Sequence, residues 1–125
     1  MFMAKAEEFV ATAEDALEEG RNSSAAGNAV HAGINAADAI LGARTGQRAA
    51  GQDHGQVVEL IVAVPGVGRD AANRLRRLLP LKSKAEYDPT PISASDARRA
   101  VEQAQALVVV ARRVVAERLG LDTPD

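Results

Sequence analysis

The sequence predicts an all-α protein, and two observations carry that prediction. Apolar residues make up 46% of the 125 positions but aromatic residues only 2%, so alanine and valine supply most of the apolar surface. This composition favours closely packed helices over β-sheets, which are enriched in aromatic residues. Apolar residues also recur at helical spacing in successive segments, which glycine, proline and capping residues separate.

The first two helices are expected over residues 3–19 and 24–42. The apolar residues of the first recur every fourth position: Phe9, Ala13 and Leu17. Gly20 is suited to end this helix. The residue types that follow are ones that cap the start of a helix: Asn22, Ser23 and Ser24. The apolar stripe of the second helix comprises Val30, Ile34, Ala37 and Leu41. Residues 42–52 contain three glycines and predict a loop.

Three further helices are expected, from a capping Asp53 to about residue 64, over 69–79 and over 95–119. Residues 80–92 contain three prolines and predict an extended connection, with Pro80 ending the helix before it. Ser93 and Asp96 have the spacing of a capping box. The last helix is apolar on more than one side, which indicates that a partner subunit covers part of it. The tail, residues 120–125, is expected to be frayed.

The size and composition restrict the classes of function. A chain of this length is expected to form a single domain over residues 1–125, with a core that needs no disulfide or metal. It has no cysteine, which argues against a thiol nucleophile and a cysteine-based zinc site, and its two histidines are too few for an all-histidine zinc site within one chain. No cofactor is expected. The net charge is −2, and no apolar run is long enough for a membrane span or a signal core. We therefore expect a cytoplasmic protein.

One segment imitates a dinucleotide-binding motif. Residues 57–64, VVELIVAV, have the composition of a buried strand, and residues 66–71 fit GxGxxA, with Glu86 at a suitable distance beyond them. However, Pro65 separates the apolar run from the glycines, and no second strand is available to pair with the first. A corner between two helices at 65–68 is the preferred interpretation.

Charge is distributed unevenly along the chain. The first helix carries six carboxylates: Glu7, Glu8, Glu14, Asp15, Glu18 and Glu19. The helix over 69–79 and its exit carry six basic residues: Arg69, Arg74, Arg76, Arg77, Lys82 and Lys84. Two interpretations remain open: solvated faces that attract each other, or a basic surface for phosphate or an acidic partner. In the second case Arg74, Arg77 and Lys82 are the expected RNA-backbone contacts.

Two groups of polar residues can carry chemistry. Asn28, His31, Asn35 and Asp38 form one stripe of the second helix. This stripe is either a solvated edge or hydrogen-bonded helix contact, or a cleft in which His31 transfers protons. His54 lies at the start of the third helix, and Arg48 precedes it by six positions in the glycine-containing loop. This second pair is either a chance spacing on the surface or a base and a phosphate clamp.

Two segments resemble the HEPN family. Residues 28–41, NAVHAGINAADAIL, resemble its second helix, which is rich in small residues and contains a histidine. Residues 78–110, LLPLKSKAEYDPTPISASDARRAVEQAQALVVV, resemble its last part, where a basic-Ala-Glu/Asp-Tyr-Asp turn precedes a capped, alanine-rich helix. The most specific piece is residues 85–88, which include Tyr87. The resemblance spans about residues 9–117.

The resemblance implies a four- to five-helix up-and-down bundle that dimerises, here through the helix over 95–119 or that over 24–42. Many family members are metal-independent ribonucleases of toxin–antitoxin and other defence systems. Their motif is an arginine, four to six residues and a histidine, which Arg48 and His54 fit. By resemblance, His54 assists attack by the 2′-hydroxyl and Arg48 stabilises the phosphate charge. His31, Asn35, Asp38 and Tyr87 are candidates for the adjoining cleft.

The same resemblance leaves an alternative. The family has a polar residue directly after the arginine, whereas this chain has Ala49. Relatives without the motif act as nucleotide-binding, RNA-binding or interaction modules, so a non-catalytic binding or scaffold module with a degenerate motif is the second hypothesis. Expected partners are a second copy of the chain, RNA, and a cognate antitoxin or a nucleotidyltransferase-type protein.

Overall fold

The computed structural model describes residues 2–46 and 54–120. This part of the chain forms six α-helices and no strand, which confirms the all-α prediction. The helices are α1 (Phe2–Glu18), α2 (Asn22–Thr45), α3 (His54–Val62), α4 (Gly68–Leu78), α5 (Pro80–Tyr87) and α6 (Ala94–Arg118).

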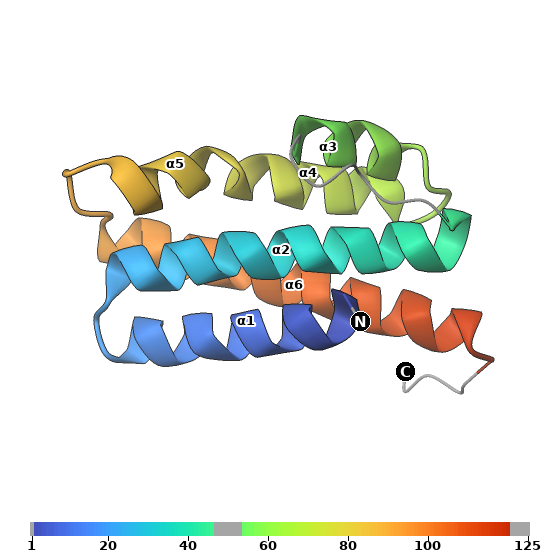
Figure 1. Ribbon diagram of the computed structural model, residues 1–125, viewed down its shortest axis with the longest axis horizontal. Coiled ribbons are helices and arrows are strands. Elements are labelled where there is room, and N and C mark those ends of the chain that lie inside the picture. The colour runs from blue at the N-terminus through green and yellow to red at the C-terminus, as the bar shows by residue number, and fades with distance from the viewer. Residues whose placement is uncertain (1, 47–53, 121–125) are drawn as a thin grey trace.

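Helices α2 and α6 lie at the centre of an up-and-down bundle (Figure 1). Helix α1 packs against both of them on one side, and α3, α4 and α5 lie on the other. Helices α4 and α5 follow one another almost without interruption, because Leu79 between them keeps helical backbone angles (φ −56°, ψ −39°). The bundle therefore has four long helical segments: α1, α2, the combined α4 and α5, and α6. The short α3 packs beside them.

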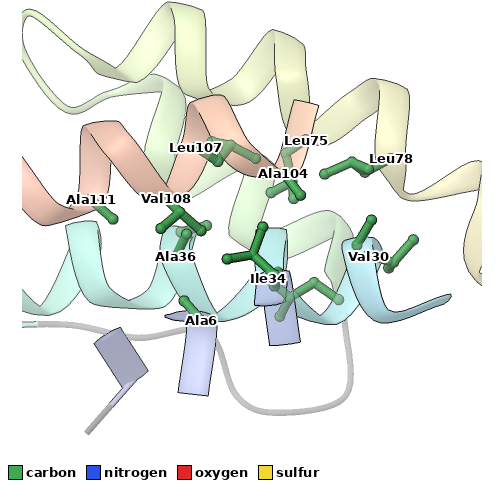
Figure 2. Packing of buried hydrophobic residues seen from close by; sticks show 14 of the residues in the cluster. Ala6, Val30, Ile34, Ala36, Leu75, Leu78, Ala104, Leu107, Val108 and Ala111 are labelled. Carbon is green, nitrogen blue, oxygen red and sulfur yellow. The ribbon is translucent and has the colours of Figure 1, made fainter. Parts of the chain in front are cut away.

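The core consists largely of alanine, valine and leucine (Figure 2). Alanine brings helices close together, and a close approach within the central bundle is at Gly33 of α2. A Cβ atom at that position would lie 2.6 Å from Cδ1 of Leu78 and 3.4 Å from Cδ1 of Leu107. Helix α6 is apolar on several sides because α1, α2 and α4 all pack against it. Most of the apolar surface of α6 is thus buried by other helices of the same chain.

Local signals set several helix ends. Gly20 has a φ of +74°, its N–H donates to the Leu17 carbonyl, and the Arg21 N–H donates to the Ala16 carbonyl. These two bonds form the Schellman motif that ends α1, as expected for glycine there. Helix α6 begins at the expected serine, since the Asp96 N–H donates to Ser93 Oγ at 3.0 Å.

The serine-rich start expected for α2 is wrong in detail. Arg21 occupies the N-cap position of α2, and no side chain accepts a hydrogen bond from the free amides of the first turn. The expected loop also begins late, because α2 continues through Gly42 to Thr45 and ends at Gly46, whose φ is +73°. Nothing crowds Gly42, so this glycine is accommodated within a helix at only the cost of its intrinsic propensity.

Residues 80–92 were expected to be extended, and for 80–87 this is wrong. These residues form α5, with Pro80 in its first turn. Proline is tolerated there because its missing N–H would have no partner within the helix and its fixed φ suits helical backbone. The same residue type that ends a helix elsewhere therefore starts one here, and the extended connection is confined to residues after Tyr87.

The segment that imitates a dinucleotide-binding motif is a helical corner. Its apolar run belongs to α3, and the glycines lead into α4. Gly66 has a φ of +82°, which suits glycine, and the Gly68 N–H donates to the Val64 carbonyl. A Cβ at Gly68 would lie 2.2 Å from the carbonyl oxygen of Ile61. Gly68 thus allows the close approach of two helices, as the sequence interpretation preferred.

Candidate functional site

The proposed catalytic pair lies at the junction between α2 and α3. His54 is the first described residue of α3. Arg48 and the capping Asp53 lie outside the residues that the structure describes. The convergence of Arg48 and His54 in one cleft therefore stays a prediction.

The polar stripe of α2 mostly bonds to its own helix. Asn35 donates to the His31 carbonyl at 2.9 Å, and Asn28 donates to the Ser24 carbonyl at 2.8 Å. Bonds of this kind stay within one helix and form no contact between helices. Asn35, a cleft candidate, is thus engaged with its own backbone.

His31 faces a carboxylate that the sequence analysis did not place beside it. Its Nε2 lies 3.7 Å from Oε1 of Glu86, and the other Glu86 oxygen lies 3.8 Å from Nζ of Lys82. The ring of Phe9 lies against the imidazole, with 5.2 Å between centroids. These contacts bring side chains of α1, α2 and α5 together at one point.

The remaining cleft candidates lie elsewhere. Asp38 lines a cavity of about 240 Å³ between α1, α2 and α6, together with Phe2 and Arg118. Tyr87, which is 77% exposed, lines a separate shallow hollow at the end of α5 with Lys84 and Asp88. The structure therefore does not bring His31, Asp38 and Tyr87 together in one cleft.

Two of the three expected RNA-backbone contacts have carboxylate partners within the chain. Arg74 donates to Asp70 at 2.9 Å and to Gln103 at 3.1 Å, while Lys82 pairs with Glu86. Arg77 instead lines an open groove of about 260 Å³ between α4, α5 and α6. Of these three cations, Arg77 is the one most available to a ligand.

The acidic helix α1 does not meet the basic helix α4, because the two pack on opposite sides of the central pair (Figure 1). Helix α1 bonds to α6 instead. Arg112 donates to both oxygens of Glu7 at 2.8 Å, and Gln105 donates to Glu14 at 2.7 Å. The hydrogen bonds that Arg112 donates to Glu7 raise the pKa of Arg112. The mutual attraction of two solvated faces, which was one interpretation of the charge pattern, is thus not realised within the chain.

Sequence reasoning missed three residues that the fold brings to these surfaces. Glu86 meets His31 although 55 positions separate them in the chain, and Arg99 and Gln103 line the groove beside Arg77. One local signal was present for the last two. Asp96, Arg99 and Gln103 follow at i, i+3 and i+7, which places them on one face of a helix.

Two further searches covered the described residues. Across residues 2–46 and 54–120, no three histidine, cysteine, aspartate or glutamate side chains are grouped as a metal ion would require. In the same part of the chain, no helix combines the length and the hydropathy needed to span a bilayer.

The bundle, with a groove between α4, α5 and α6 that Arg77 and Arg99 line and a histidine at the start of α3, defines a small helical domain. The profile of the HEPN domain family matches residues 1–114. Because this match covers most of the chain, the protein belongs to the HEPN domain family. No curated protein and no solved structure matched the chain.

The two segments that resemble this family contact each other in the fold. A Cβ at Gly27 of α2 would lie 3.7 Å from the Ala85 Cβ of α5, and His31 faces Glu86 one helical turn further on. Gly27 therefore gives α5 room to lie close to α2. The small-residue helix thus contacts Ala85 and Glu86 of the Ala-Glu-Tyr-Asp element, while Tyr87 stays 77% exposed.

Proposed function

We propose that the protein is an RNA-associated HEPN protein that acts as a metal-independent endoribonuclease of a toxin–antitoxin or defence system. The observation that carries the proposal is the Arg-x5-His spacing of Arg48 and His54, with the histidine at the start of α3 in a chain that belongs to this family. In this proposal His54 is the catalytic base and Arg48 the phosphate clamp.

The chemistry follows from these two groups. His54 accepts the proton of a ribose 2′-hydroxyl, whose oxygen attacks the adjacent phosphorus and displaces the 5′-oxygen of the next nucleotide. The guanidinium of Arg48 stabilises the negative charge that develops on the phosphate oxygens. The leaving oxygen takes up a proton, so the products are a 2′,3′-cyclic phosphate and a free 5′-hydroxyl.

A second copy of the chain is part of the proposal, and α6 is the helix that leaves room for it. Half of α2 is buried by the chain itself, twelve of its 24 residues, against eight of 25 in α6. Helix α6 presents an outer face on which Val109 is 47% exposed, flanked by Gln105 and Arg113. Of the two helices that were expected to form the dimer, α6 is therefore the proposed interface.

The test is cleavage of single-stranded RNA by the purified protein in EDTA. We expect cleavage by the unaltered protein, and a loss of at least 100-fold in His54→Ala and Arg48→Ala. The matched control is His31→Asn, which removes the other histidine and is expected to keep most of the activity. Cleavage that survives His54→Ala would refute the residue assignment. Growth arrest on expression, relieved by a neighbouring gene, is the expected cellular result.

The alternative function is a non-catalytic nucleotide- or protein-binding scaffold with a degenerate motif. The residue after Arg48 favours it, because Ala49 stands where the family has a polar side chain. RNA binding without cleavage, unchanged by His54→Ala, would support this alternative over the nuclease.

A further inference from the structure

The groove between α4, α5 and α6 combines an apolar floor with a polar rim. Pro80, Leu81 and Ala100 form the apolar part, and its volume is about 260 Å³. The side chains that add polar groups are Arg77, Arg99, Gln103 and Asp96. Three of these four are hydrogen-bond donors, and they come from two helices that the fold holds side by side.

The hydrogen bonds around the groove decide which of its groups are available. Arg74 lies behind Gln103, and its guanidinium donates both to Gln103 Oε1 at 3.1 Å and to Asp70 at 2.9 Å. Because the Gln103 oxygen is already an acceptor, its amide nitrogen is the group left to donate to a ligand. Arg74 therefore acts as a positioning residue whose own charge is balanced by Asp70.

The two arginines of the rim keep most of their donors available. Arg77 forms no hydrogen bond or ion pair with any residue that the structure describes. Arg99 is 72% exposed, and its contact with Asp96 is long, at 3.5 Å. Asp96 is the one carboxylate among the described residues of the lining, so the groove keeps an excess of one positive charge.

A ligand that matches this arrangement brings several acceptor oxygens with negative charge. Guanidinium groups donate to phosphate in a paired geometry, and charge-assisted bonds of this kind are about twice as strong as neutral ones. The apolar floor suits the sugar or base attached to the phosphate, and bound phosphate also relieves the repulsion between the two guanidinium groups.

We infer that this groove binds a backbone phosphate of single-stranded RNA through Arg77, Arg99 and the amide of Gln103. The inference rests on the proposed RNA association and adds to it a binding surface apart from Arg48 and His54. It also revises the contacts expected from the sequence, because Arg74 supports the groove from behind and Lys82 is held by Glu86.

The test is RNA affinity with charge-matched variants. All proteins carry His54→Ala, so that RNA is not cut, and binding of a fluorescent single-stranded RNA is followed by anisotropy in EDTA. We expect Arg77→Gln/Arg99→Gln to weaken binding at least 10-fold and to reduce the slope of log K against log salt by about 1.4. Arg69→Gln/Arg98→Gln removes the same charge from exposed positions of the same helices and is expected to weaken binding less than 3-fold.

The outcomes separate the two proposals. Equal loss in both double variants, with circular dichroism showing that both remain folded, would overturn the groove and leave the RNA proposal standing. Absence of RNA binding by the reference protein overturns both.

A second measurement titrates inorganic phosphate and follows the Gln103 side-chain amide by NMR. Saturable shifts with phosphate but no RNA binding would overturn RNA as the source of the phosphate and identify a free anion as the ligand.

Discussion

Replacement of Gly68 by alanine tests the corner between α3 and α4. The added methyl would lie 2.2 Å from the Ile61 carbonyl oxygen and 3.0 Å from that of Val62, about 1 Å short of ordinary contact. Both atoms belong to the backbone, so no side chain can rotate to make space. Overpacking of this kind costs about 1–3 kcal/mol, and the alanine recovers less than about 1 kcal/mol of helix propensity. We expect Gly68→Ala to lower the free energy of unfolding by about 2 kcal/mol.

The matched control is the same substitution in α2. Gly42 is helical, its φ is ordinary, and a Cβ there would meet nothing within 4 Å. Gly42→Ala is therefore expected to stabilise the protein by about 0.5–1 kcal/mol. Denaturant unfolding monitored by circular dichroism measures both variants, and the melting temperature should fall by roughly 5–10 °C for Gly68→Ala. If Gly68→Ala were as stable as Gly42→Ala, the close packing of α4 onto the end of α3 would be refuted.

Three further predictions concern surface interactions. Ser93→Ala is expected to cost about 1 kcal/mol in urea unfolding because α6 loses its cap, and no change would refute the capping role. A double-mutant cycle with Glu7→Gln and Arg112→Gln is expected to give a coupling of about 0.5–1 kcal/mol that falls in 1 M salt, and coupling independent of salt would contradict an exposed ion pair. The pKa of Asp88 lies below its ordinary value, mainly because the Thr90 N–H donates a hydrogen bond to the Asp88 carboxylate. The ionised carboxylate therefore stabilises the fold at pH values above the pKa of Asp88 in the unfolded chain. This contribution is lost as pH falls through the pKa of Asp88 in the folded chain. An NMR titration should show Thr90→Val raising that pKa part of the way, and an unchanged or lower midpoint would exclude the hydroxyl's contribution.

The sequence predicted those parts of the fold that depend on neighbouring residues. Gly20 and Ser93 end and begin helices because glycine adopts a positive φ and the serine hydroxyl accepts an amide hydrogen bond, and both effects act within four residues. The error at Pro80 has the same local origin. Proline both ends helices and occupies their first turn, and the residues beside it do not decide between the two.

The parts that the sequence did not predict depend on contacts between distant segments. The charge pattern identified an acidic and a basic helix, but the packing of α1 against α6 decided that Glu7 would pair with Arg112. The partner of His31 was missed for the same reason, since Glu86 becomes its neighbour only when α5 packs on α2. A hydrophobic stripe specifies which face of a helix is buried, whereas the identity of the neighbouring helix follows from the whole bundle.

The position of His31 has a consequence for the proposed chemistry. The chain has two histidines, and His31 lies between Phe9 and Glu86, in contact with α1 and α5. The proposed catalytic role therefore rests with His54. Cleavage by 2′-hydroxyl attack needs one group that accepts a proton and another that supplies one to the leaving oxygen. The second group is either a second copy of His54 from a partner chain or a water molecule. Val109→Glu on the outer face of α6 separates the two cases, because it should abolish dimerisation, and cleavage that survives in the monomer would exclude a second His54. His31→Asn should keep both dimerisation and cleavage.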